Sequence, residues 1–319
     1  MKKIIILTLA LLVSAMGYSQ KSIQELSSLS DKKFDKALRT YNGGSPAIIK
    51  SFSKSCRRMG QELPEEVKPS LKKVGVLTFY LSDFSELDNK RALRNGGIYA
   101  DNLTTAATAE LASTFYQTSL AQLKESYQAQ GIELLTPDQF LDTEAKKEAY
   151  YSTEIELSKA SKLVSALSRN VGRKNEKSPN APDGYRVVYN SMSIDGADKK
   201  AVISLGKLAK ELGLDGLLSV QVLTNLKGKT IGFHKVRMAL HGVNPIPYDG
   251  TCKWVGGYFE GLLMEFGEVS GNDLVFAKIK KKALADVNIE GFDALLGRLS
   301  TKILNQMEID YSSAKSKKK

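Results

Sequence analysis

The sequence predicts an α/β fold in which a mixed sheet is flanked by helices. Three observations indicate this class. Short, nearly continuous apolar runs at residues 74–80 and 217–223 are typical of strands that are covered on both faces. Longer amphipathic stretches separate these runs, and turn-forming residues divide the chain between them. Apolar residues make up 42% of the 319 residues, which is enough to build a substantial core.

The chain opens with the three parts of a secretory signal peptide. Lys2 and Lys3 give a positive start, residues 4–13 form an apolar run, and small residues then allow cleavage before Tyr18 or before Gln20. The apolar run has about ten residues, which is too short for a stable transmembrane helix, so an uncleaved anchor is the weaker alternative. We therefore expect residues 1–19 to be a cleaved signal peptide and the mature protein to be periplasmic or secreted.

The remaining chain is expected to have three parts. An N-terminal helical segment covers residues 20–66, an α/β domain covers residues 67–311, and a basic, disordered tail covers residues 312–319. The α/β domain is interrupted at about residues 142–200 by a mainly helical insertion, whose apolar content is too thin for a core of its own.

Hydrophobic spacing and turn signals predict each element in order. In the N-terminal segment they predict two helices, one before and one after the break at residues 42–46. In the α/β domain they predict strands at 74–80 and 132–135, an edge strand at 186–189, strands at 217–223 and 230–240, and a hairpin of 262–269 with 274–281. They also predict helices at 99–130, 146–171, 201–212 and 292–307, with a helical turn at 136–138; Gly131 and Gly213 are expected to end two of these helices.

The strand at 230–240 contains one of the two histidines. Strict alternation along it puts His234 on one face, together with Val236, Met238 and Leu240, and puts Ile231 and Phe233 on the other face. His241 follows seven residues after His234, and metal ligands on one strand face need an even spacing. We therefore interpret both histidines as core or surface residues, and expect no metal site.

Cys56 and Cys252 are the two cysteines of the chain. In an oxidising compartment such a pair is a candidate disulfide. Alternatively, Cys56 is a buried thiol, because it shares an apolar helical face with Ile48, Ile49 and Phe52. The sequence leaves both interpretations open.

The net charge of +11 is concentrated in two places. One is a basic tail and the other is an internal cluster. The tail contains Lys315, Lys317, Lys318 and Lys319, and the cluster contains Lys278, Lys280, Lys281 and Lys282. Basic segments contact anionic lipid, polysaccharide or nucleic acid, whereas a solvated and disordered end is the simpler interpretation of the tail. Export argues further against nucleic acid.

No catalytic pattern stands out in the sequence. Zinc-binding and phosphate-loop motifs are not found, so we expect no catalytic residues and no cofactor. An aromatic-rich stretch surrounds Gly256-Gly257 and contains Trp254, Tyr258 and Phe259. These side chains are candidates for contact with a glycan or a partner loop, with core packing as the alternative.

Four segments carry a family resemblance. They are the strand at 73–79, the long helix that leads into 131–135, the helix–Gly–Asp–strand step at 209–218, and the turn and strand at 268–276. Together they cover about half of the chain. They resemble a group of periplasmic α/β domains that includes the curli-secretion channel lipoprotein, the outer-membrane lipoprotein activator of peptidoglycan synthases, and the amino-terminal domain of the Tol-system propeller protein.

The resemblance implies an anticodon-binding-domain-like fold and a protein-binding or assembly role without catalysis. The lipidated members of the group carry an acylated cysteine at the mature start, which this chain lacks, so we expect no lipid anchor. The insertion at 142–200 also has no counterpart in the group.

We therefore expect an exported, non-enzymatic protein-binding or assembly factor of the bacterial cell envelope, as part of a secretion or assembly machine. Its partner would be another envelope protein or a second copy of the chain, not a nucleic acid, and it would reach the membrane only through that partner. The alternatives are a hydrolase whose site the sequence does not reveal and a glycan- or lipid-binding module.

Overall fold

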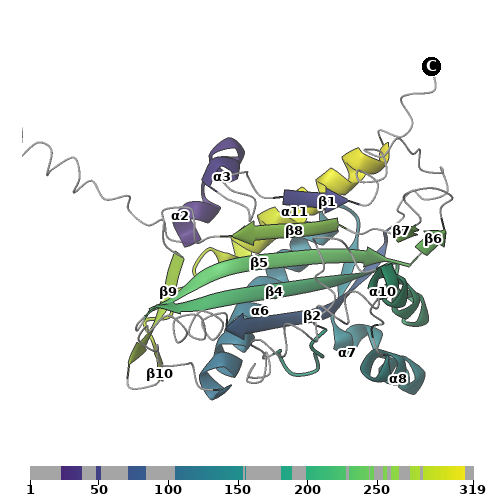
Figure 1. Cartoon of the computed structure of the whole chain (residues 1–319), viewed down its shortest axis with the longest axis horizontal. Coiled ribbons are helices and arrows are strands. Elements are labelled where there is room, and N and C mark those ends of the chain that lie inside the picture. Colours follow the sequence, from purple (N-terminus) through teal and green to yellow (C-terminus); the bar gives the residue numbers. More distant parts are fainter. Residues whose placement is uncertain are drawn as a thin grey trace, which may run out of the picture.

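The computed structural model describes a mixed α/β sheet with helices on both faces, which confirms the predicted fold class (Figure 1). The described residues are 23–37, 48–51, 71–83, 105–153, 155, 181–188, 199–227, 230–243, 245–247, 254–256, 260–265, 274–280 and 283–312. No helix among them is long and apolar enough to cross a membrane.

The sheet has eight strands, and six of them follow the order β1-β8-β5-β4-β2-β3. Strand β9 lies beside β5, and β10 lies beside β9. The strands are β1 (Ile48–Ser51), β2 (Lys73–Asp83), β3 (Glu133–Leu135), β4 (Gly216–Lys227), β5 (Thr230–Gly242), β8 (Glu260–Glu265), β9 (Leu274–Lys280) and β10 (Ala283–Ala285). Strand β2 is parallel to β3 and β4, and the other pairs are antiparallel. A separate ribbon pairs β6 (Pro245–Pro247) with β7 (Trp254–Gly256).

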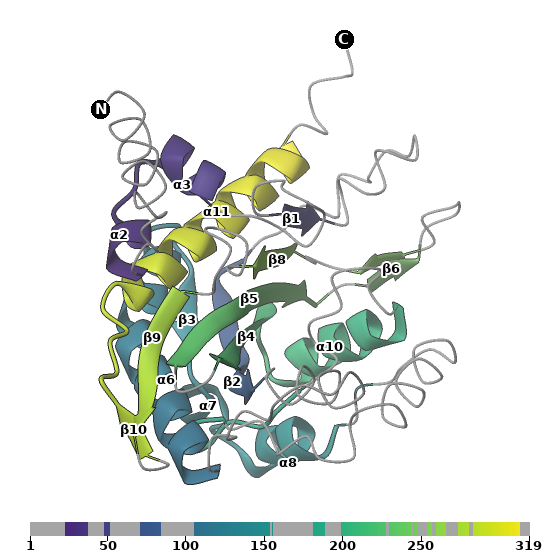
Figure 2. The same cartoon turned by 60° about the vertical axis from the view of Figure 1, so that its left-hand side comes forward.

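Helices cover both faces of the sheet (Figure 2). They are α2 (Ile23–Ser27), α3 (Asp31–Ala37), α6 (Thr105–Gln128), α7 (Pro137–Phe140), α8 (Glu144–Ser152), α10 (Lys199–Glu211) and α11 (Phe292–Ser312). Helices α6 and α11 pack on the first face, and α7, α8 and α10 pack on the second. The predicted helix ends at Gly131 and Gly213 are confirmed, because both glycines have the left-handed backbone of a C-terminal cap, with φ of 72° and 71°.

Aromatic rings fill the centre of the first face. The ring centroid of Phe115, on α6, lies 5.4 Å from that of Phe233 and 4.5 Å from that of Phe292. The three rings are fully buried and come from α6, β5 and α11, so they join the two helices to the sheet. On the second face, Leu205 and Leu208 of α10 pack in a smaller apolar cluster that ends near the start of β4.

Bulges in β2 and in β5 reset the side-chain alternation of these two strands. In β2, Val76 pairs with Leu218 and Thr78 with Ser219, so Leu77 is an extra residue. In β5, His234 is the extra residue, because Phe233 pairs with Thr224 and Lys235 with Leu223. Residues of β5 on both sides of the bulge therefore face the same core: Ile231, Phe233, Val236, Met238 and Leu240. The predicted alternation, which separated these residues onto two faces, is wrong because a bulge shifts the period by one residue.

Three predicted elements are corrected by the structure in other ways. The helix predicted after the break at residues 42–46 is a strand at Ile48–Ser51, which pairs with β8, and residues 52–59 lie outside the described part. The predicted hairpin is also wrong: β8 and β9 both pair with β5, at different ends, and the described residues show no ladder between them. With 13 residues, β5 is long enough to pair with two strands in line. The long helix of the insertion ends at Ser152, with Thr153 as its cap.

The N-terminal helices are held to α11 by Arg298. Its guanidinium donates to the carbonyl oxygens of Ser27 and Leu29, both at 2.7 Å, and to the Asp31 carboxylate at 2.8 Å. It also lies 4.0 Å from the centroid of the Phe34 ring, which is fully buried. This hydrogen bond from Arg298 holds the pKa of Asp31 below its usual value, so the carboxylate remains an ionised acceptor.

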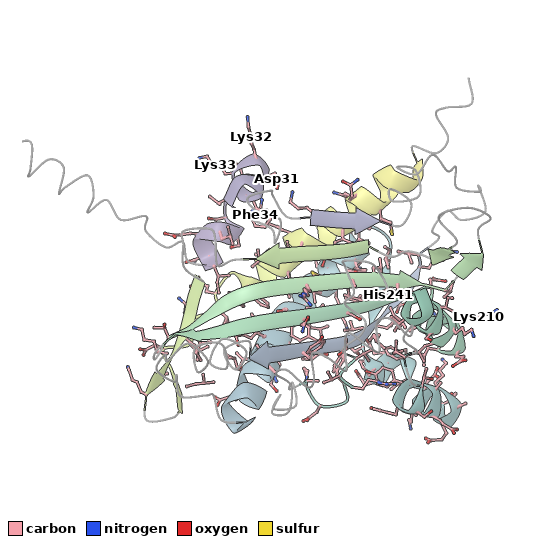
Figure 3. The ribbon with its side chains drawn as sticks, in the orientation of Figure 1. Asp31, Lys32, Lys33, Phe34, Lys210 and His241 are labelled. Atoms are coloured by element: carbon pink, nitrogen blue, oxygen red, sulfur yellow. The ribbon has the colours of Figure 1, made fainter. Side chains whose placement is uncertain are left out.

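A close backbone approach completes this docking. Gly291, just before α11, has a φ of 84°, and a Cβ atom there would lie 2.8 Å from the Cα of Gln24. Only glycine fits this position without moving α2. Figure 3 shows Asp31 and Phe34 on α3, with Lys32 and Lys33 beside them on the outer side of that helix.

Replacement of Arg298 by lysine tests the docking. Lysine keeps the charge but loses the planar fork that reaches two carbonyls and a carboxylate at once, so we expect Arg298→Lys to lower the free energy of unfolding by about 1–2 kcal/mol. Hydrogen exchange should accelerate at the Phe34 amide, which donates to Ser30. Asn305→Gln, at an exposed position two turns further along α11, is the control and should change stability by less than about 0.5 kcal/mol. Equal effects of the two changes would contradict this account.

Candidate functional site at the open edge of the sheet

Strand β3 is the last strand at its side of the sheet among the described residues. It pairs with the first residues of β2 over Lys73–Gly75, and its outer side faces a groove of about 470 Å³. The groove runs between the two helical layers, because α6 covers the first face and α7 the second. It is lined by Lys124, Gln128, Gly131, Ile132, Glu133, Leu134, Leu135 and Gln139.

One residue of β3 presents its backbone to the groove. The Glu133 N–H donates to the carbonyl oxygen of Lys72 at 2.7 Å, on the β2 side. Because backbone groups alternate along a strand, the N–H and C=O of Leu134 point away from β2. The neighbouring donors are already used: the Ile132 N–H donates to Tyr127 O at 3.0 Å and the Thr136 N–H to Gln139 Oε1 at 3.0 Å. Leu134 is thus the position where an added strand would bond.

The walls of the groove are polar and its floor is apolar. The Lys124 ammonium donates to Gln139 Oε1 at 3.0 Å, which links α6 to α7 beside the strand. Gln128 is exposed on α6, whereas Ile132 and Leu134 are buried, with 6% and 4% of each whole residue exposed. An apolar floor with amide and ammonium walls suits the backbone of an extended peptide, which needs hydrogen bonds along its length.

Strand β3 pairs only with Lys73–Gly75 of β2, and the Tyr150 side chain covers the outer edge of β2 further along. The Tyr150 hydroxyl donates to the carbonyl oxygen of Leu77 at 2.7 Å and accepts from the Arg186 N–H at 3.2 Å. The hydroxyl therefore stands between two backbone groups that would bond directly in a ladder. This explains why residues 186–188 lie beside β2 without forming the predicted edge strand. Residue 189 lies outside the described part.

The segment around Arg186 is anchored to α8 and to the core. The Arg186 guanidinium donates to the carbonyl oxygens of Tyr150 and Thr153 and so caps the C-terminus of α8. The hydroxyls of Tyr116 and Tyr185 lie 2.8 Å apart. Burial raises the pKa values of Tyr150 and Tyr185 above the usual value of 10.0, so both hydroxyls remain protonated at neutral pH. With this edge of β2 occupied, the groove at β3 is the open part.

The second face of the sheet also has several polar side chains, which come from β2, β4 and β5. Arg237 Nη1 lies 3.5 Å from Gln221 Oε1, and the register places Tyr80 on the other side of Gln221. The Ser219 hydroxyl is fully buried and has no hydrogen-bond partner within the described structure. Among the described residues, no group of three or more His, Cys, Asp or Glu side chains could hold a metal ion.

The structure places few of the residues that the sequence singled out. Cys56, Cys252, Tyr258 and Phe259 lie outside the described residues, so the disulfide and the aromatic contact stay predictions. Trp254 begins β7, and the β6–β7 ribbon lies beside α10. The second histidine, His241, is 2% exposed and belongs to β5, which extends beyond the strand predicted at 230–240.

Sequence reasoning missed the open edge and the tyrosine that closes the rest of it. The strand at 133–135 was expected, but nothing local shows that it is the last strand. Comparisons with family models, curated proteins and solved structures found no match to this chain.

Removal of the Tyr150 hydroxyl tests its bridging role at the outer edge of β2. Tyr150→Phe leaves the Leu77 carbonyl and the Arg186 N–H without their partner, and we expect the free energy of unfolding to fall by about 2 kcal/mol. Tyr151→Phe is the matched control, because Tyr151 is 54% exposed and its hydroxyl donates to the Gly184 carbonyl at 3.1 Å. This change should cost about 0.5 kcal/mol or less. Chemical denaturation of the two variants measures both values, and a similar loss in each would refute the bridging role.

Proposed function

We propose that this chain is an exported, non-enzymatic protein-binding or assembly factor of the bacterial cell envelope, and that it holds its partner as an added strand on β3. The observation that carries the proposal is the groove beside β3, where an edge strand lies open between two helices. Main-chain hydrogen bonds provide affinity in this mode of binding, and side-chain pockets provide specificity.

The groove supports a short contact. Leu134 offers one donor and one acceptor, and the exposed amides of Gln128 and Gln139 can bond the backbone of a bound segment on either side. A strand of three residues gives few hydrogen bonds, which favours a reversible partner over a permanent subunit. The short edge also limits unspecific pairing between copies of the chain.

We include an anticodon-binding-domain-like fold in the same proposal. The order β2–α6–β3 and the step from α10 through Gly213 and Asp215 into β4 support an anticodon-binding-domain-like arrangement, as in the periplasmic domains that the chain resembles. The Asp215 carboxylate accepts from the N–H groups of Lys72 and Lys73 at 2.9 and 2.8 Å. The step therefore fixes the start of β2 next to β4, which in turn positions β3 at the edge.

The export part of the proposal rests on the sequence of residues 1–19. We expect the mature protein isolated from cells to begin at Tyr18 or Gln20 and to leave the cytoplasm. Amino-terminal sequencing and cell fractionation measure both properties. Lys2→Glu/Lys3→Glu should slow processing, because the positive start of the signal is lost. A full-length chain with Met1 intact in the cytoplasm would count against export.

Site-specific photo-crosslinking tests the groove. A benzophenone side chain at Gln128 should form adducts with a partner segment in living cells, whereas the same side chain at Gln130 should not. Both glutamines are exposed near the end of α6, but only Gln128 lines the groove. Mass spectrometry identifies the adduct, and an adduct with this same chain would make the partner a second copy.

A blocking variant complements the crosslinks. Gln128→Trp fills the groove and should reduce partner capture about tenfold, a loss of about 1.4 kcal/mol of binding free energy, whereas Gln130→Trp should leave it unchanged. Both changes are at exposed positions, so stability should shift by less than about 0.5 kcal/mol. Equal crosslinking from both positions, or capture that survives Gln128→Trp, would exclude the β3 groove as the binding site.

A further inference from the structure

The hairpin of β9 and β10 lies at one corner of the sheet and contains two members of the internal lysine cluster (Figure 1). Lys278 and Lys280 are two residues apart on β9, so their side chains leave the same face of the strand. These side chains are 53% and 65% exposed. Lys281 and Lys282 follow directly in the sequence, before β10 begins.

The sheet register places the last residue of β4 at the same corner. Thr230 pairs with Lys278 on one side and with Lys227, the last residue of β4, on the other. Lys229 immediately precedes Thr230 in the sequence. In the sequence, residues 227–229 and 278–282 contain six lysines: Lys227, Lys229, Lys278, Lys280, Lys281 and Lys282.

One carboxylate faces this cluster within the described structure. Asp286 Oδ2 lies 3.1 Å from the Lys280 ammonium and 3.8 Å from the Lys278 ammonium. A single acid shared by two lysines leaves an excess of positive charge, and both ion pairs are exposed to solvent. The corner is therefore a cationic surface and not a neutralised network.

An exposed apolar residue follows the acid in the chain. Val287 follows Asp286 and is 41% exposed, and Tyr151 is the other large apolar side chain that the described residues leave exposed. Lysines beside an exposed apolar residue match a membrane interface, where phosphate headgroups lie above acyl chains. The phosphate backbone of a nucleic acid has no such apolar layer, so the combination favours lipid.

We propose that the β9–β10 hairpin binds the anionic phosphate headgroups of a lipid surface, with Val287 at the boundary of the acyl chains. The proposal does not depend on the groove at β3. It departs from the expectation that membrane contact is made only through a protein partner. Each lysine near an anionic surface contributes about five-fold to affinity, and added salt weakens the contact.

Co-sedimentation with phosphatidylcholine vesicles that contain phosphatidylglycerol tests the proposal on the mature full chain. Lys278→Gln/Lys280→Gln should lower the partition coefficient about 25-fold, from two lysines at about five-fold each. Vesicles of phosphatidylcholine alone should not bind. Lys32→Gln/Lys33→Gln removes the same charge from α3, away from the hairpin (Figure 3), and should change binding less than about twofold.

A variant that is expected to increase binding distinguishes a loss of lipid affinity from a loss of folding. Asp286→Asn removes the acid that pairs with Lys278 and Lys280 among the residues that the structure describes, so vesicle binding should rise about five-fold. Asparagine tolerates the left-handed backbone of this residue, whose φ is 51°, so the turn should be kept. A misfolded hairpin would lower binding in both variants, whereas a cationic lipid-binding surface predicts a fall in one and a rise in the other.

Four results would overturn the proposal. They are an equal loss in the α3 control, an unchanged partition coefficient in the Asp286 variant, binding that disappears only when residues 313–319 are removed, and full competition by inorganic phosphate or duplex DNA at the same phosphate concentration. Full competition by inorganic phosphate would indicate a site for a single ion, and full competition by DNA would indicate a nucleic-acid-binding surface. Binding that persists without residues 313–319 and still falls with Lys278→Gln/Lys280→Gln would support it.

Discussion

The burial of one apolar face against α6 and α11 depends on the bulges in β2 and β5. Val74 and Val76 lie before the bulge of β2, Phe79 and Leu81 lie after it, and all four face the same core only because Leu77 is an extra residue. A strictly alternating strand would turn the later pair to the opposite face. Since each fully buried apolar side chain contributes about 1.5–3 kcal/mol, the position of the bulges is a major determinant of stability.

The bulge in β2 also determines what happens at the edge of the sheet. An extra residue interrupts the regular ladder, and the Leu77 carbonyl takes its hydrogen bond from Tyr150. That hydroxyl in turn binds the Arg186 N–H, while the Arg186 side chain caps α8. Strand β3 covers the outer edge of β2 before Leu77, and the Tyr150 side chain covers it at Leu77. The outer side of β3 is therefore the part of this sheet edge that stays open.

The elements that could be predicted from the sequence are those with a local cause. Gly131 and Gly213 mark helix ends because of their backbone freedom, and continuous apolar runs mark β2 and β4. The bulge at His234 has no local signature, since it is defined by which residues of β4 lie opposite. The apolar pattern around Ile48 fits both a helix and a strand, and pairing with β8 decides between them. The groove at β3 was missed for the same reason, because a strand becomes an edge only through the arrangement of its neighbours.

The two proposed surfaces lie at opposite corners of the sheet. Strand β3 pairs with the start of β2, which lies beside Gly216 at the start of β4, whereas β9 pairs with β5 beside the last residues of β4. The 12 residues of β4 span roughly 40 Å, so a bound peptide and a lipid surface would not compete for space. A chain held on lipid by its β9–β10 hairpin would present the β3 groove away from that contact. Confinement to a surface raises the effective concentration of any partner in the same membrane, so a groove with few hydrogen bonds could still capture its partner there.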